Sequence, residues 1–331
     1  MTLKKIALYG SGAFGTALAI SCVRAGQDVT LLTRSPVTAA ILNADRRNER
    51  YLPGITFPES LKISHDLKNL TSSDLILLAT PAQSLFTVLA DLKPYLNPKT
   101  PLILCAKGID RQHQMLLSDV AKQQVSNPIA MLSGPSFAIE IAQNQPTAVM
   151  LAAESLEDAI ALSQPLRHAN FRCYASEDLV GVQIAGAVKN VIAIASGIVY
   201  GKAFGNNTRA ALLSRGLAEM CRLGLAMGAK QETFLGLAGV GDLILTGTSE
   251  LSRNFCFGKV WGETLSREAA MAAMAGKVVE GSATAEVLKS IAEQHQVRMP
   301  ICQNVYDLLY TAKPLQEIID ALLSHQSNLE I

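Results

Sequence analysis

Two lysines occupy positions where a positive charge could act on a bound molecule. Lys107 directly follows Leu102–Ala106, an apolar run typical of a buried β-strand, and ligands of open α/β sheets bind outside the carboxyl ends of the strands. Lys189 lies among small and apolar residues in Gly186–Asn190. Its ammonium group either reaches solvent along its own side chain or faces a cleft, where desolvation would lower its pKa and suit it to proton exchange. Position alone leaves both alternatives open.

Two further segments carry charged side chains of other kinds. Asp242 follows a glycine-rich run, with Thr246 four positions later, and its carboxylate could hold a lysine in an active site. Arg253 lies between Ser252 and Asn254, and a guanidinium group can bind a phosphate through two hydrogen bonds. Either segment alone is compatible with an ordinary loop. With the lysines, they favour reduction of a carbonyl group, in which cations stabilise the charge on oxygen and a nicotinamide provides the hydride.

A glycine-rich loop near the N-terminus predicts where such a cofactor binds. The apolar run Ile6–Tyr9 is followed by the pattern G-x-G-x-x-G at Gly10, Gly12 and Gly15, and a helical segment, Phe14–Arg24, comes next. The first glycine permits a tight turn, the second lets the backbone approach a pyrophosphate, and the third lets helix and strand pack closely. A glycine-rich turn without a ligand is the alternative, which the strand, loop and helix context disfavours.

The end of the next predicted strand, Val29–Thr33, bears on the choice of dinucleotide. Arg34 follows it, at the place where NAD-specific sites usually carry an acidic residue for the ribose 2′-hydroxyl. An arginine accommodates a 2′-phosphate instead, so Arg34 favours NADPH, although use of both NADP and NAD is compatible with the sequence. An arginine simply exposed at a strand end is the alternative interpretation.

The elements that must position these residues change character along the chain. The first half alternates short apolar runs with helical segments, which predicts a doubly wound sheet of Rossmann type with helices on both faces. Glycine and proline residues predict a loop over Asn48–Pro58. The second half has apolar residues at helical spacing, and Asp178–Tyr200 is apolar nearly all round, as expected of a buried central helix. The predicted strands are Ile6–Tyr9, Val29–Thr33, Asp74–Ala79, Leu102–Ala106, Pro128–Leu132, Thr147–Ala152 and Phe171–Ala175, and the predicted helices between them are Phe14–Arg24, Ser35–Asp45, Ala82–Leu92 and Ser155–Leu166.

We therefore expect an α/β fold with two domains. Residues 1–179 are predicted to form the dinucleotide-binding domain, and residues 180–331 an all-helical, substrate-binding C-terminal domain. A chain of 331 residues is long enough for two such cores.

Composition excludes several other classes of protein. The chain has 29 basic and 28 acidic residues, a formal net charge of +1, so it lacks the one-sided field that nucleic acid or an anionic membrane requires. Lys189 and Asn190, at the centre of the most apolar stretch, argue against a membrane span. The six cysteines have no metal-binding or redox spacing, so we expect no metal and buried thiols in a reducing compartment. The chain runs almost at once into the glycine loop, so we expect no signal peptide.

Taken in order, these segments resemble a known family. Their combination is similar to the motif set of bacterial NAD(P)-dependent glycerol-3-phosphate dehydrogenases, over about residues 4 to 310. One departure is Ala13, where many members carry serine; it removes one possible phosphate contact and leaves the backbone donors of the loop in place. The segments are Gly10–Gly15, Lys107–Gly108, Ser133–Ala138, Gly186–Asn190, Gly239–Asp242, Ser252–Asn254 and Val278–Gly281.

The resemblance implies roles for individual residues. Lys189 matches the proton donor and acceptor, and Lys107 matches a lysine that touches both substrate and cofactor. Asp242 matches the substrate site and is expected, with Thr246, beside the catalytic lysine. The other implied substrate positions are Gly134, Ser136, Ser252, Arg253 and Asn254, with Arg253 on the phosphate and also near the cofactor. The other implied cofactor positions are Gly10, Gly12, Phe14, Gly15, Arg34, Ala138, Val278 and Glu280.

The implied reaction is the reversible reduction of dihydroxyacetone phosphate to sn-glycerol 3-phosphate with NADPH or NADH. The family is cytoplasmic, often forms homodimers, and supplies sn-glycerol 3-phosphate for phospholipid synthesis. Two other functions are compatible with the residues. A dehydrogenase for a non-phosphorylated hydroxy acid or ketone would not need Arg253 for a phosphate. A nucleotide-binding sensor without catalysis would need neither the two lysines nor Asp242.

Overall fold

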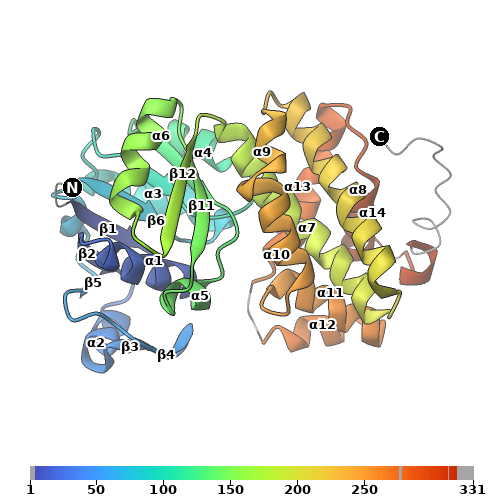
Figure 1. Ribbon diagram of the computed structural model, residues 1–331, viewed down its shortest axis with the longest axis horizontal. Helices are drawn as coiled ribbons and strands as arrows, with labels where there is room; N and C mark the ends of the chain where they lie inside the picture. The colour runs from blue at the N-terminus through green and yellow to red at the C-terminus, as the bar shows by residue number, and fades with distance from the viewer. Residues whose placement is uncertain (1–3, 276–277, 312, 319–331) are drawn as a thin grey trace. The chain divides into compact units, whose positions relative to one another are not determined.

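An eight-stranded sheet forms the centre of the first of two compact units in the computed structural model (Figure 1). The structure describes residues 4–275, 278–311 and 313–318. The first unit contains the chain up to Lys107 together with Met115–Val182. The second contains the short segment Gly108–Gln114 and the chain from Gln183 onward. A segment from the first half of the sequence thus belongs to the second unit.

The order of the strands in the large sheet confirms the predicted Rossmann-type fold. Six strands run parallel in the order β10-β7-β6-β1-β2-β5, which is the doubly wound order with its switch point beside β1. Beyond β10, β11 pairs antiparallel and β12 pairs parallel to β11. The strands are β1 (Lys5–Tyr9), β2 (Asp28–Leu32), β5 (Lys62–Ser64), β6 (Leu75–Leu78), β7 (Leu102–Leu104), β10 (Ile129–Ser133), β11 (Thr147–Ala152) and β12 (Phe171–Ser176).

Helices cover the sheet because its central strands are apolar on both faces. All residues of β6, β7 and β10 are buried, as expected of parallel strands between two helical layers. On one face, Leu18 of α1 packs in a core cluster with Leu8 and Leu132. Each such buried leucine contributes roughly 1.5–3 kcal/mol. The helices of this unit are α1 (Ala13–Arg24), α2 (Pro36–Asp45), α3 (Leu85–Leu92), α4 (Leu117–Gln124), α5 (Ala138–Ala142) and α6 (Leu156–Ser163).

The loop predicted over Asn48–Pro58 is wrong, because this segment contains part of a small hairpin. β3 (Arg47–Asn48) pairs antiparallel with β4 (Leu52–Thr56), with an irregular register between Arg47 and Asn48. Pro53 and Gly54 are tolerated because β4 has a partner of only two residues and lies outside the large sheet. A second short hairpin, β8 (Ile109–Asp110) with β9 (Met115–Leu116), was likewise not predicted.

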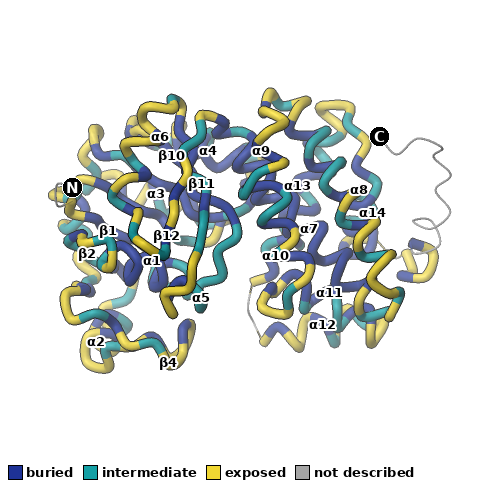
Figure 2. Tube along the Cα trace, in the orientation of Figure 1, coloured by how far each residue is buried: buried dark blue, intermediate teal, exposed yellow. Residues whose placement is uncertain are grey.

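Among the described residues of the second unit, every regular element other than β8 is a helix. Its helices are α7 (Leu179–Gly201), α8 (Gly205–Ala226), α9 (Gln231–Leu235), the π-helical turn η5 (Leu237–Gly241), α10 (Asp242–Thr248), α11 (Arg253–Thr264), α12 (Arg267–Ala273), α13 (Glu280–Gln294) and α14 (Pro300–Tyr310). Helix α7 is buried almost along its whole length, as its apolar sequence predicts (Figure 2). Within the described ranges it is the one helix long and apolar enough to cross a membrane, but its apolar window lies entirely inside the protein, as in the core helix of a globular protein.

Candidate active site

A buried ion pair joins two helices of the second unit. The ammonium group of Lys189, on α7, donates to Asp242 Oδ1 at 2.7 Å and to Thr246 Oγ1 at 2.6 Å. The hydroxyl of Thr246 in turn donates to Asp242 Oδ1 at 3.2 Å. Only 6% of the Lys189 side chain and 1% of the Asp242 side chain are exposed. Lys189 therefore does not extend to solvent but is held among polar partners in the interior.

Local structure explains why the two partners of Lys189 lie together. Asp242 begins α10 directly after the π-helical turn Leu237–Gly241, and Thr246 lies one helical turn further on. Residues four apart share a face of an α-helix, so both oxygens point to the same side. A π-helical turn inside a helical stretch is frequent at functional sites. The four-residue spacing of Asp242 and Thr246 in the sequence thus allows both side chains to accept a hydrogen bond from Lys189.

Buried carboxamides connect α7 with two further helices. Asn254 Nδ2, near the start of α11, donates to Asn190 Oδ1 at 2.9 Å. The backbone N–H of Gly281, in the first turn of α13, donates to Asn254 Oδ1 at 3.0 Å. Asn190 was not among the predicted site residues, although an amide next to Lys189 in an apolar helix was a signal for it. These bonds fix the three helices that carry Lys189, Arg253 and the start of α13.

The remaining predicted residues of the second unit lie at the beginnings of helices. Ser252 caps α11, because its side chain accepts a hydrogen bond from the N–H of Phe255 at 3.3 Å. Arg253 is exposed at the first position of that helix. Glu280 opens α13 and is half-buried, while Val278 is exposed before it. An exposed guanidinium at a helix N-terminus is suited to an anion, because the unpaired N–H groups there add positive charge.

In the first unit, the glycine loop has the geometry that a dinucleotide requires. Gly10 has φ of 116°, and a Cβ there would lie 2.5 Å from the carbonyl oxygen of Ala79. A Cβ on Gly15 would lie 1.9 Å from the carbonyl oxygen of Gly10. Helix α1 then begins after Gly12 without any side-chain cap. The loop thus brings bare backbone and a helix N-terminus to the end of β1, which fits a pyrophosphate.

Lys107 contacts the loop that follows β10. Its ammonium group donates to the carbonyl oxygen of Gly134 at 2.8 Å and to Ser136 Oγ at 3.3 Å. It also lies 6.0 Å from the centre of the Phe14 ring, at the start of α1. Four residues predicted to contact substrate or cofactor are therefore neighbours at the carboxyl end of the sheet. Ser133, just before them, is 1% exposed, and its hydroxyl has no hydrogen-bond partner among the described residues.

Two other predicted cofactor residues lie in the first unit. Arg34 is exposed two residues after the end of β2. It precedes Ser35, which caps α2 by accepting from the N–H of Thr38. Ala138 begins α5 and is half-buried. Arg34 thus lies after β2, and Ala138 lies after β10. The exposed guanidinium of Arg34 is open to a charged ligand.

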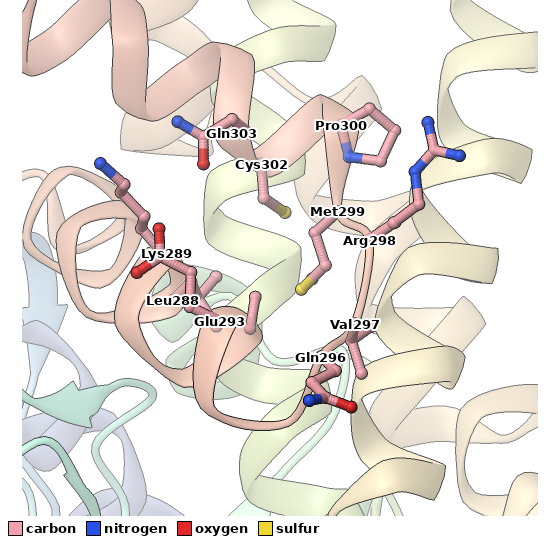
Figure 3. A pocket seen from close by; sticks show the side chains of 11 residues that line it. Leu288, Lys289, Glu293, Gln296, Val297, Arg298, Met299, Pro300, Cys302 and Gln303 are labelled. Atoms are coloured by element: carbon pink, nitrogen blue, oxygen red, sulfur yellow. The ribbon is translucent and has the colours of Figure 1, made fainter.

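A hollow of about 320 Å³ in the second unit does not involve the predicted site (Figure 3). It lies between the end of α13 and the start of α14, where Met299 and Cys302 direct their sulfur atoms toward it and Arg298 points away. No predicted catalytic, substrate or cofactor residue lines it. The wall at Cys302 is supported by Glu219, whose carboxylate accepts from the N–H groups of Ile301 at 2.7 Å and Cys302 at 3.1 Å.

Comparison with known proteins agrees with both units. Residues 5–159 match the family model described as NAD-dependent glycerol-3-phosphate dehydrogenase N-terminus, and residues 178–320 match the corresponding C-terminus. The chain is 44% identical to glycerol-3-phosphate dehydrogenase [NAD(P)+] of Parvibaculum lavamentivorans, covering 98% of each chain. It is similar to the crystal structure of glycerol-3-phosphate dehydrogenase from Coxiella burnetii, with a TM-score of 0.92, 38% identity and coverage of 97% and 99%. The Saccharomyces cerevisiae enzyme gives a TM-score of 0.84 at 26% identity, with coverage of 96% and 99%.

The fold and the two sets of residues define an NAD(P)-dependent oxidoreductase with a dinucleotide-binding sheet and a helical second part. The uncapped start of α1, and the close backbone contacts that a Cβ at Gly10 or Gly15 would disrupt, are what such a cofactor needs. The chain belongs to the NAD-dependent glycerol-3-phosphate dehydrogenase family.

Proposed function

We propose that this protein catalyses the reversible reduction of dihydroxyacetone phosphate to sn-glycerol 3-phosphate with NADPH or NADH. The observation that carries the proposal is the buried contact of Lys189 with Asp242 and Thr246, in a chain of this family. A sensor that only binds nucleotide would not need to bury a lysine with a carboxylate, which is costly unless the pair is well compensated. The family membership also favours a phosphorylated substrate over a non-phosphorylated one.

Lys189 is proposed to donate the proton that the carbonyl oxygen of the substrate requires. The bound nicotinamide supplies the hydride to the carbonyl carbon. Asp242, at 2.7 Å, favours the charged form of the lysine and fixes its direction, and Thr246 holds it from a second side. In the reverse reaction the same group takes the proton back from the hydroxyl.

Lys107 is proposed to act on the same carbonyl oxygen as Lys189, and Arg253 on the phosphate of the substrate. Lys107, held by the carbonyl of Gly134 and the hydroxyl of Ser136, polarises the carbonyl group as negative charge develops on its oxygen. Arg253 binds the phosphate in bidentate fashion, with Ser252 and Asn254 beside it in the substrate site. Arg34 selects NADPH by binding the 2′-phosphate.

The remaining proposals concern the cofactor contacts, the oligomeric state and the location of the protein. Gly10, Gly12, Phe14 and Gly15 are proposed to contact the cofactor, together with Ala138, Arg253, Val278 and Glu280. The family resemblance supports a homodimer in the cytoplasm that supplies sn-glycerol 3-phosphate for phospholipid synthesis. The domain division at residues 179 and 180 stays a prediction. Size-exclusion chromatography with light scattering measures the oligomeric state.

Oxidation of NADPH by dihydroxyacetone phosphate, followed by absorbance, tests the activity directly. Wild-type protein is expected to oxidise NADPH only with the phosphorylated ketone. The Lys189→Ala variant is expected to bind NADPH but to show no turnover. Lys68→Ala, at an exposed position, is the matched control and should behave as wild type. Near-native turnover of Lys189→Ala would remove the role given to that lysine. NADPH binding without turnover of any ketone by the wild type would favour the sensor.

A further inference from the structure

A buried asparagine lies beneath the glycine loop and touches it directly. Asn48 is only 4% exposed. Its Nδ2 donates one hydrogen bond to the carbonyl oxygen of Ser11 at 2.9 Å and another to Thr16 Oγ1 at 2.8 Å. Because a carbonyl oxygen can only accept, the amide nitrogen and not the amide oxygen must face Ser11. Both hydrogens of one side-chain nitrogen are thus used on the loop and on the first turns of α1.

The segment that carries Asn48 is itself anchored to the core of the first unit. Arg46 ends α2 in the left-handed conformation, with φ of 51°. Its guanidinium donates to the carbonyl oxygens of Leu61 at 3.0 Å and Pro58 at 2.5 Å, and its own carbonyl accepts from the N–H of Phe57 at 2.8 Å. Leu61 and Phe57 are buried in the core cluster. The backbone that carries Asn48 is therefore held in place by these contacts, so its side chain can hold the glycine loop in one position.

The bond to Ser11 determines the direction of the next backbone N–H. A peptide unit is planar and trans, so the carbonyl of Ser11 and the N–H of Gly12 point in opposite directions. Since Asn48 holds the carbonyl on its own side, the N–H of Gly12 must point to the opposite side of the loop. A loop held in advance binds its ligand more tightly than a loop that must be ordered on binding.

We propose that Asn48 is a positioning residue for the cofactor, which fixes the glycine loop so that its backbone donors are directed at the dinucleotide pyrophosphate. The inference rests on the proposed role of Gly10–Gly15 in cofactor binding. The pyrophosphate is common to NADPH and NADH, so Asn48 acts on both cofactors equally, whereas Arg34 acts on the 2′-phosphate of NADPH alone.

Titration of purified full-length variants with NADPH and with NADH, by quenching of intrinsic fluorescence, tests this claim. Asn48→Ala is expected to raise both dissociation constants by the same factor, on the order of tenfold, as removal of a supporting contact does at other ligand sites. The rate at saturating cofactor and substrate should change little. Arg34→Ala should instead weaken NADPH binding selectively. Thr16→Val removes the second acceptor of Asn48 while conserving volume, and should leave both constants near the wild-type values.

A second variant guards against simple loss of folding. Asn48→Asp conserves the shape of the side chain, but its carboxylate cannot donate to the Ser11 carbonyl. When protonated, the introduced carboxyl regains a donor, and burial favours this neutral form. Cofactor affinity of Asn48→Asp should therefore recover as the pH falls from 8 toward 6, more than that of the wild type, whereas a merely structural role would not produce such recovery.

The outcomes separate the inference from the proposed function. Equal dissociation constants for wild type and Asn48→Ala, with NADPH still bound, would overturn the role of Asn48 and leave the proposed function intact. A Thr16→Val variant as weak as Asn48→Ala would also overturn it, because the Ser11 bond would then not be the one that matters. Failure of the wild type to bind either dinucleotide would instead overturn the proposed function.

Discussion

The Lys189–Asp242 pair allows a quantitative test, because both members are buried within one unit of the protein. Removing one member of a buried ion pair leaves the other charge uncompensated and costs about 3–5 kcal/mol. Here the ammonium and carboxylate are 2.7 Å apart and at most 6% exposed, so both single variants should fall in that range. Lys189→Met leaves a buried carboxylate beside Thr246, and Asp242→Leu leaves a buried ammonium. Either change should also remove most of the activity.

The double variant is the informative one. Lys189→Met with Asp242→Leu removes both charges together, so the combined loss of stability should be several kcal/mol smaller than the sum of the two single losses. Urea unfolding of the four proteins measures this coupling, and NADPH oxidation measures activity, which should stay absent in the double variant. Thr246→Val removes one acceptor of Lys189 and one donor to Asp242 but leaves the ion pair in place, so it should cost less than either single charge variant, roughly 1.5–3 kcal/mol. Additive losses for the double variant would refute the reasoning, because they would mean that the two side chains do not depend on each other.

Three further changes have defined outcomes. Burial raises the pKa of the Glu219 carboxyl from 4.5 to about 7, against the opposing effect of its two backbone hydrogen bonds. The raised pKa means that the folded state favours the protonated carboxyl. Its contribution to the free energy of unfolding, about 3 kcal/mol, is therefore fully present below pH 4.5 and is lost as the pH rises through about 7. Glu219→Gln should flatten this part of the stability profile in urea unfolding, and an unchanged slope would contradict it. Ser133→Ala removes a buried hydroxyl that has no partner among the described residues, so it should raise the free energy of unfolding by about 1 kcal/mol or more; a lower unfolding midpoint would show that the hydroxyl is paired. Arg253→Met should raise the Michaelis constant for dihydroxyacetone phosphate at least about tenfold, as expected for loss of a charge-assisted bidentate contact, and an unchanged constant would favour a non-phosphorylated substrate.

Elements with a strong local signal could be predicted from the sequence. The run Ile6–Tyr9, the glycine loop and the following helix agree with β1 and α1 to within one residue, because apolar runs and a required positive φ leave few alternatives. Strand β11 begins and ends at the predicted residues, Thr147 and Ala152. The buried helix α7 is also confirmed to within one residue. In each case the local sequence pattern is long enough to predict the element without knowledge of its contacts in the folded protein.

Short elements and supporting amides could not be predicted, because distant contacts define them. β3 and β8 have two residues each and are strands only through their partners. Asn48 contacts Thr16, 32 positions earlier in the chain, and Asn190 contacts Asn254, 64 positions later. Asn48 looks like an ordinary loop residue in the sequence, and the position of Asn190 in an apolar helix indicates burial without indicating its partner. Only the fold brings their side chains to groups that need a partner.

Because Gly108–Gln114 belongs to the second unit, the two units cannot be separated by truncating the chain at one position. This segment pairs Arg111 with Glu286 of α13 at 3.3 Å, and β8 packs on the same helix. A fragment that begins at Gln183 would include every helix from α8 onward but would lack Gly108–Gln114. The surface of α13 that packs against this segment would then be exposed to solvent. An N-terminal fragment ending at Val182 would carry the segment without its helix. Neither half is a self-contained polypeptide, so the two units are expected to be expressed, and to fold, as one chain.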